Sequence, residues 1–224
     1  MWNLNVSPKT ALLSVLGCGA LSSLLGWSGA SCISRPAPTP ELPVPSIYAA
    51  GYESNGAHDV AMFWRDGLGT ALTDGLNQAC AHAIALSAGA DVYVAGEESA
   101  GSRVQAKVWK NGLATTLSGT AISASARAVV VSDQDVYVGG YESNGGHARA
   151  MIWKNGEAQP LTDGSQDAYV ADLALAGTTL YAVGHQSNGQ HEVAVLWQNG
   201  NPMAVSNGHS DAYARSIVRV GRDV

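Results

Sequence analysis

The sequence predicts an all-β protein, a β-propeller of four four-stranded antiparallel blades that is closed by its N- and C-terminal strands. Three observations predict this fold. First, 26 of the 224 residues are glycine, only 13% are charged, and no helical periodicity follows Pro45, as expected for short strands joined by tight turns. Second, a segment of about 44 residues recurs four times. Third, each copy contains four strand-like runs, the content of one propeller blade.

The repeat is defined by tyrosine, glycine and tryptophan at fixed spacing. The tyrosines are separated by 45, 44 and 44 residues: Tyr48, Tyr93, Tyr137 and Tyr181. A glycine follows each tyrosine after three residues and a tryptophan follows after sixteen, the latter being Trp64, Trp109, Trp153 and Trp197. Because a buried indole removes roughly 150–250 Å² from water, we expect each tryptophan to pack between neighbouring blades. An aromatic platform for sugars is the alternative.

The third repeat illustrates the strand prediction. Its strands are expected at residues 126–132, 135–142, 148–154 and 157–162. Asn155-Gly156 predicts a type I′ hairpin, because both turn positions need a positive φ. Pro160 suits an outer edge strand, where its missing N–H faces solvent. The chain enters at a second strand, residues 47–53, and leaves on a first strand, residues 214–220, so we expect these two strands to pair and close the ring.

The first 32 residues differ from the rest. Residues 1–10 carry one charge, Lys9, and residues 11–30 are uncharged and apolar, which predicts a secretory signal; a retained anchor is the alternative. Residues 29–32, Gly-Ala-Ser-Cys, resemble a bacterial lipobox, and this resemblance implies cleavage before Cys32 and lipidation of its thiol. Cys18 is a rival lipidation site, and ordinary cleavage near Ala30 is a further alternative.

Residues 33–46 predict an extended tether between the signal and the repeats. Five of the eight prolines fall in this stretch, and each one fixes φ and discourages helix in the residue before it. The segment is therefore expected in polyproline II conformation, with a proline-rich ligand for a partner domain as the alternative. Residues 47–224 then form the repeat domain. Cys80 is its one cysteine, expected as a small buried hydrophobe without a disulfide partner.

Three strings in the third repeat carry a resemblance to a known class of protein. Trp-Lys-Asn-Gly at 153–156, Leu-Thr-Asp-Gly at 161–164 and Val-Tyr-Val-Gly-Gly-Tyr-Glu-Ser-Asn-Gly at 136–145 look like repeats of exported, often lipid-anchored bacterial β-propeller proteins. The resemblance covers residues 47–224. It implies a propeller fold and a location in the cell envelope, and it implies no particular activity.

Charged residues near the predicted axis are the candidate binding site. Aligning the innermost strands places four residues in one column: His82, Arg127, Ala171 and Arg215. Asp172 falls in the next column. We predict that His82, Arg127, Asp172 and Arg215 line the channel mouth and bind a small anion or the acidic end of a ligand. An Arg–Asp network that satisfies itself and plugs the channel is the alternative.

Two sets of repeated loops carry residues that can bind metal ions. Equivalent loops carry three histidines: His58, His147 and His191. The symmetry of the ring holds these loops apart, whereas zinc needs converging ligands about 2 Å away. The other loops carry Asp74, Asp163 and Asn207, which suit local turns better than calcium, an ion that needs six or more oxygens. No metal site and no cofactor is expected.

Composition limits the classes of function. Lys and Arg total 12 against 18 Asp and Glu, giving a net charge of −6, so nucleic-acid binding is not expected. No catalytic motif is present. We therefore predict a non-enzymatic, exported and lipid-anchored module that binds an unknown protein or glycan, or acts as a scaffold, at the cell surface. The alternatives are a lectin with one weak site per blade, a hydrolase or lyase with an axial site, and a secreted or periplasmic location.

Overall fold

The computed structural model describes residues 45–132 and 135–220. The predicted signal at residues 1–32, with Cys18 and Cys32, and all but the last two residues of the predicted tether at 33–46 lie outside the described residues. Within the described part of the chain, no helix has the length and apolarity needed to cross a membrane.

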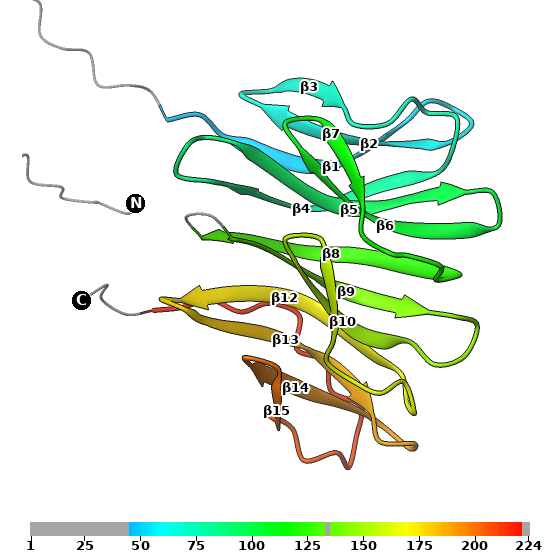
Figure 1. The fold of residues 1–224 in the computed structure, drawn as a ribbon, viewed down its shortest axis with the longest axis vertical. Helices are drawn as coiled ribbons and strands as arrows, with labels where there is room; N and C mark the ends of the chain where they lie inside the picture. Colours follow the sequence, from blue (N-terminus) through cyan, green and yellow to red (C-terminus); the bar gives the residue numbers. More distant parts are fainter. Residues whose placement is uncertain (1–44, 133–134, 221–224) are drawn as a thin grey trace, which may run out of the picture. The chain divides into compact units, whose positions relative to one another are not determined.

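The described residues form fifteen strands, which fall into four groups that follow the four repeats (Figure 1). We call these groups units one to four. Unit one contains β1 (Tyr48–Ser54), β2 (Asp59–Arg65) and β3 (Leu68–Ala71). Unit two contains β4 (Ala79–Leu86), β5 (Val92–Ala100), β6 (Arg103–Lys110) and β7 (Leu113–Thr116). Unit three contains β8 (Ser123–Ser132), β9 (Asp135–Ser143), β10 (Arg149–Lys154) and β11 (Glu157–Pro160). Unit four contains β12 (Ala168–Ala176), β13 (Thr179–Ser187), β14 (Glu192–Gln198) and β15 (Asn201–Ala204).

These units form three sheets, because units two and three are joined. Unit one is a three-stranded sheet, unit four a four-stranded sheet, and the middle units share an eight-stranded sheet. Within each unit, neighbouring strands are antiparallel. The join is a single parallel pair, Val104 with Ser123. The strands of unit three lie within three residues of those expected from the sequence.

The hairpins between the last two strands of each unit have the predicted chemistry. Their first turn residues have φ between 47° and 53°, in the left-handed region, and are Asp66, Asn111, Asn155 and Asn199. A glycine with positive φ follows each of them, as a type I′ turn requires. The same side chains have a second role: Asn155 Oδ1, for example, accepts a hydrogen bond from the N–H of Val136 at 2.9 Å.

The apolar core is divided among three interfaces between successive units. Trp109 packs against Ala61 and Phe63 of unit one. Trp153 packs with Ala95 and Ala106 of unit two, and Trp197 with Ile152 of unit three. These three indoles are 0–1% exposed. The expectation that tryptophans pack between units is therefore confirmed for three of the four repeats, and a sugar platform built from those three is excluded.

In units two to four, the repeated glycine after the tyrosine is explained by a bulge in the neighbouring innermost strand. Registers shift around His82 in β4, around Arg127 in β8 and around Ala171 in β12. At each bulge the carbonyl two residues earlier approaches the glycine on the adjacent strand. A Cβ at Gly140 would lie only 1.9 Å from the carbonyl oxygen of Ser125, so no side chain fits there.

The predicted propeller of four four-stranded blades closed by the terminal strands is wrong. Unit one has three strands, units two and three share a sheet, and none of the sheets is closed. Residues 211–220, which we call the C-terminal segment, form no strand. The segment stays with unit four, where Ala212 N–H donates to Glu192 O at 2.8 Å and Ile217 N–H donates to Asp172 at 2.9 Å. These hydrogen bonds join it to the unit that directly precedes it in the chain, and it does not pair with β1.

Candidate functional site

The bulges place the predicted column of residues along one edge of the innermost strands. An extra residue in one strand of an antiparallel pair bends the strand and redirects its side chain. His82, Arg127 and Ala171 are these extra residues, and Arg215 occupies the equivalent place in the C-terminal segment. His82, Arg127 and Arg215 are all exposed. We call this edge the inner edge.

A row of four aromatic rings runs along the inner edge of units three and four. Tyr141 on β9 meets Tyr169 on β12 edge to face, with ring centroids 4.9 Å apart. Tyr169 stacks on His185 of β13 at 5.0 Å with an interplanar angle of 25°. His185 meets Tyr213 of the C-terminal segment at 4.8 Å and 70°. We call this set the aromatic row; its contacts have the edge-to-face and offset geometries that aromatic pairs prefer.

A guanidinium lies at each end of the aromatic row. The Cζ atom of Arg127 is 5.4 Å from the ring centroid of Tyr141, and that of Arg215 is 5.3 Å from the centroid of Tyr213. Both are cation–π distances. Among the ion pairs within residues 45–132 and 135–220, none involves Arg127 or Arg215. The guanidinium of Arg215 thus faces the ring of Tyr213, while the charge of Arg127 also acts on the Glu97 carboxyl group.

The electrostatics of the row favour a neutral imidazole between two fixed positive charges. Burial lowers the pKa of His185 below its usual value, and the charges of Arg215 and Arg127 lower it further. Because both charges act on the imidazole of His185, both arginines lie near it. Burial is also the main cause of a raised pKa for the Tyr169 hydroxyl, so this ring stays uncharged at neutral pH.

His82 belongs to a separate part of the inner edge, in unit two. Its Nε2 atom lies 3.6 Å from the Glu97 carboxylate. Burial acts to raise the pKa of Glu97, but the neighbouring His82 and the charge of Arg127 outweigh it, so the pKa of Glu97 is lowered. The inner edge thus changes along its length, from a histidine–glutamate pair in unit two to rings and arginines in units three and four.

Asp172 does not act with the arginines in this structure. Its carboxylate accepts hydrogen bonds from the backbone N–H of Leu173 at 2.8 Å, from Ser216 Oγ at 2.8 Å and from the N–H of Ile217 at 2.9 Å. No ion pair of the described residues joins Asp172 to either arginine. The role of Asp172 is to hold the C-terminal segment, and with it Tyr213 and Arg215, against unit four.

The rings of the row were missed by sequence reasoning, although a signal for them exists. Tyr141 and His185 come four residues after the repeated tyrosine of their repeat, and Tyr169 and Tyr213 come two residues before the bulge position. The same columns hold Glu97 and Ser125 in other repeats. Only the pairing of β12 with β13 shows that these two columns adjoin, because Tyr169 lies opposite His185.

The two sets of repeated loops form local structure. His147 and His191 each face an aspartate, Asp167 at 3.2 Å and Asp211 at 3.4 Å. In the other loops, Asp163 Oδ1 accepts the N–H of Ser165 at 2.9 Å, as the sequence analysis expected for a turn. Among the described residues, no three histidine, cysteine or acidic side chains gather as a metal site would need.

Glu192 is a further titratable residue that the sequence did not single out. Burial, assisted by the charges of Asp167 and Asp211, raises the pKa of its carboxyl group. Both aspartates accept backbone N–H groups, from Ala148 at 2.7 Å and from Glu192 itself at 2.9 Å. These aspartates tie the entry of each following repeat to the unit before it, which gives the acids a structural role.

Cys80 is partly buried next to Glu97 and Asp59. Burial and these negative charges raise the pKa of its thiol. A raised pKa leaves less thiolate at neutral pH, so Cys80 is a poor nucleophile and metal ligand.

Comparisons with known proteins do not assign this site. No protein-family model matches the chain, and no curated protein matches it significantly.

Proposed function

We propose that the protein is a non-enzymatic binding module that takes an acidic glycan along the aromatic row of its inner edge. The single observation that carries the proposal is the uninterrupted series of four rings with a guanidinium over each end.

The chemistry of the row matches both parts of such a ligand. Guanidinium groups pair with carboxylates or sulfates through charge-assisted hydrogen bonds. Aromatic rings offer flat apolar faces with a polar tip, which suit the C–H faces of sugar rings. Because His185 stays neutral at neutral pH, the positive charge is confined to the two ends. A chain of sugars with acidic groups spaced along it fits this alternation.

We further propose that the module is exported and held at the cell envelope by lipid on Cys32. The support is the sequence of residues 1–46: a short apolar segment, a lipobox-like Gly-Ala-Ser-Cys, and a proline-rich tether. Replacing Cys32 by serine is expected to abolish incorporation of labelled fatty acid in a bacterial host, whereas Cys18→Ser should leave it intact. The reverse pattern would move the anchor to Cys18.

The binding proposal is tested with polygalacturonate, a polymer of acidic sugars. Isothermal titration should detect binding to the wild-type protein, and the double variant R127A/R215A should weaken it at least tenfold, since each charged hydrogen bond contributes about 1.5–3 kcal/mol. The matched control is R65A, which removes an exposed arginine that lies over Tyr48 in unit one. This control should bind like wild type.

Two further polymers separate charge from sugar recognition. Methyl-esterified polygalacturonate keeps the sugar rings without their charges, and poly-L-glutamate keeps the carboxylates without the rings. Both should bind more weakly than polygalacturonate. Equal binding of poly-L-glutamate would overturn the glycan assignment, and unchanged affinity in R127A/R215A would overturn the site.

The same titrations address the two other functions considered from the sequence. Four equivalent sites per chain, insensitive to the arginines, would favour a lectin with one site per repeat. Shortening of the polymer during incubation would favour a hydrolase or lyase and would overturn the non-enzymatic assignment.

A further inference from the structure

Unit one leaves an apolar face without a neighbour among the described residues. Trp64 lies on this face, opposite Ala49. The next pair on the same side is Met62 and Gly51, of which Met62 is only 8% exposed. Trp64 is only partly buried, whereas its three equivalents are at most 1% exposed. In each of those repeats the equivalent face is covered by the preceding unit. Unit one is therefore the only described unit whose tryptophan face is open.

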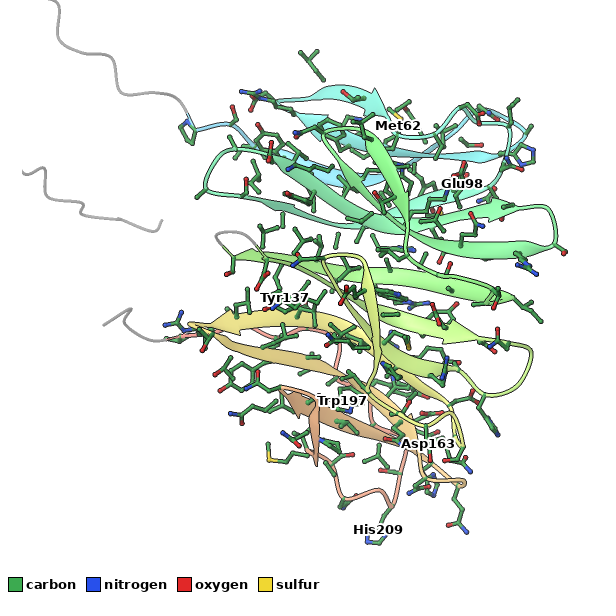
Figure 2. All side chains as sticks on the ribbon, in the orientation of Figure 1. Met62, Glu98, Tyr137, Asp163, Trp197 and His209 are labelled. Carbon is green, nitrogen blue, oxygen red and sulfur yellow. The ribbon has the colours of Figure 1, made fainter. Side chains whose placement is uncertain are left out.

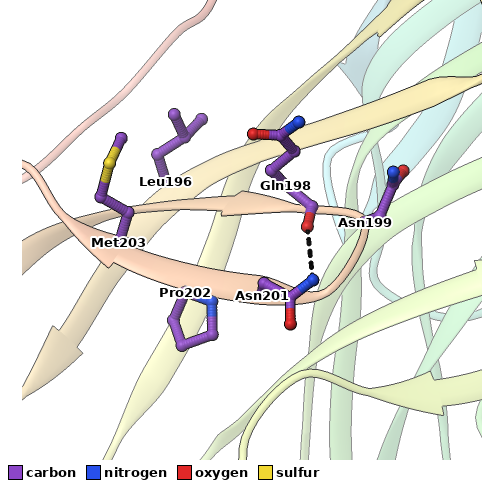
Figure 3. Close-up of a pocket in the computed structure, with 6 residues that line it drawn as sticks. All are labelled: Leu196, Gln198, Asn199, Asn201, Pro202 and Met203. Carbon is purple, nitrogen blue, oxygen red and sulfur yellow. Dashed lines mark hydrogen bonds between the residues drawn. The ribbon is translucent and has the colours of Figure 1, made fainter.

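In unit four, the face on the other side of the sheet from the tryptophan is partly open. Leu196 and Met203 are paired across β14 and β15, and Figure 3 shows both projecting to one side of this hairpin, with Pro202 on the other side. Met203 is 56% exposed. The equivalents of Leu196 all pack in cores between units: Phe63, Val108 and Ile152. Trp197, labelled in Figure 2, lies on the buried side with unit three.

The two open faces are the two halves of an interface that the chain builds three times. In the core between units two and three, the tryptophan face of unit three, with Val138, Met151 and Trp153, packs on the residues Ala95 and Ala106 of unit two. The residues equivalent to Ala95 and Ala106 in unit four are Val183 and Ala194, on the side of Leu196. Both are only 7% exposed, so the open part of this face is at Met203 and the edge of Leu196. The repeated interface within the chain thus indicates the kind of surface that fits each open face.

The strands of unit one and the sequence of the C-terminal segment support the same match between the two faces. Unit one lacks the innermost strand that every other unit has: a Cβ at Gly51 would meet only the Trp64 ring, whereas the equivalent glycines face a bulge carbonyl. The C-terminal segment has the sequence of such an innermost strand, with Arg215 at the bulge position. It lies on unit four, and residues 217–220 line a groove there together with Tyr181 and Leu196. The C-terminal segment and unit one are complementary parts of one four-stranded unit.

We propose that a second copy of this chain docks head to tail on the first. The tryptophan face of its unit one covers Leu196 and Met203 of the first copy, and its β1 lies beside the C-terminal segment. The contact is heterologous, because different surfaces of the two copies meet. It adds to the glycan proposal and is measured by a different readout, the mass of the complex, although the C-terminal segment also carries Tyr213 and Arg215 of the aromatic row.

The test is complementation between two variants of the full chain. A49E places a carboxylate beside Trp64 at an exposed position, and L196E places one on the face of unit four. Wild type should sediment above the mass of one chain at about 100 µM, well above the micromolar weak end of standard-size interfaces. Each variant alone should sediment as a monomer. An equimolar mixture should form a complex of two chains, because each variant keeps one intact face.

The matched control is L113E, which replaces a leucine that is 78% exposed on β7, away from both faces. It should associate like wild type, and circular dichroism should report the same strand content for all variants. W64E serves as a second variant of the unit-one face.

Three results would overturn the proposal. The first is a monomeric wild type at this concentration. The second is a mixture of A49E and L196E that stays monomeric. The third is association that survives L196E but not A49E, which would indicate a symmetric contact between two tryptophan faces.

Discussion

Three of the four repeated glycines lie beside a bulge on the neighbouring strand. Gly96, Gly140 and Gly184 lie where a Cβ would come within about 2 Å of a carbonyl oxygen of the adjacent strand. The bulge in turn exposes the side chains of His82 and Arg127. The glycines thus make the inner edge possible although none of them belongs to the candidate site.

We expect Gly140→Ala to lower the free energy of unfolding by about 3 kcal/mol, because the strands must separate to admit one methyl group. Gly146→Ala is the matched control, since a Cβ there has no atom within 4 Å, and it should change stability by less than about 0.5 kcal/mol. Urea unfolding monitored by circular dichroism measures both. Equal effects of the two substitutions would contradict the bulge geometry.

The pKa of His185 tests the arrangement of the aromatic row. Arg215 contributes to the lowered pKa of His185, so Arg215→Ala should raise that pKa toward its usual value, whereas Arg215→Lys keeps a charge and should raise it less. A base whose pKa is lowered by folding stabilises the fold above its unfolded pKa and loses that contribution as the pH falls through the folded value. Arg215→Ala should therefore also reduce the acid sensitivity of the fold.

An NMR titration of the His185 ring in the wild-type protein and in both variants provides the measurement. An unchanged His185 pKa in Arg215→Ala would show that the guanidinium lies elsewhere in solution.

At the scale of elements, sequence reasoning found the strands and turns and missed how the ends of the chain are arranged. Period-two patterns, Asn-Gly turns and the tryptophan spacing all act locally, so β10, β11 and their hairpin were found within a residue or two. Closure of the ring depends on whether residues 214–220 bond to β1 or to unit four, two alternatives with the same local pattern. The hydrogen bonds to Asp172 and Gly184 decide it, and no local signal in the sequence reports them.

In the candidate site, residues that share one column of the repeat were predictable from the sequence, whereas contacts between columns were not. Arg127 and Arg215 were found because one column of the repeat contains them. The aromatic row joins two further columns, whose contact depends on strand register. The hydrogen bonds of Asp172 to Ser216 and Ile217 could not be predicted from the sequence, because these partners lie 44 and 45 residues away.

The four tryptophans should differ in what they contribute to folding. Trp153 is fully buried between units two and three, so Trp153→Ala is expected to cost about 3–5 kcal/mol. Trp64→Ala should cost less than half as much when measured in the L196E background, which removes the proposed second copy. Chemical unfolding of the two variants beside L196E alone makes the comparison, and equal costs would mean that Trp64 is buried too.

At the scale of the whole molecule, the Asp172 carboxylate is one of the groups that hold the C-terminal segment on unit four. Asp172 accepts two of its hydrogen bonds from Ser216 and Ile217. Asp172→Ala should release this segment and speed tryptic cleavage after Arg215 several-fold, with the rest of the chain intact. Asp163→Ala, which removes only a local turn contact, is the control. Mass spectrometry of timed digests distinguishes the two variants, and an unchanged rate in Asp172→Ala would show that other contacts hold the segment.

The bulges have one more consequence, for how this protein changes over evolutionary time. A side chain at a bulge points away from the interior, so its identity is free of the volume limits that govern Trp153 or Ala126. The three bulges hold a histidine, an arginine and an alanine, at equivalent places in the register of their strand pairs. Over evolution, single substitutions at these positions are therefore expected to change the chemistry of the inner edge without altering the buried core.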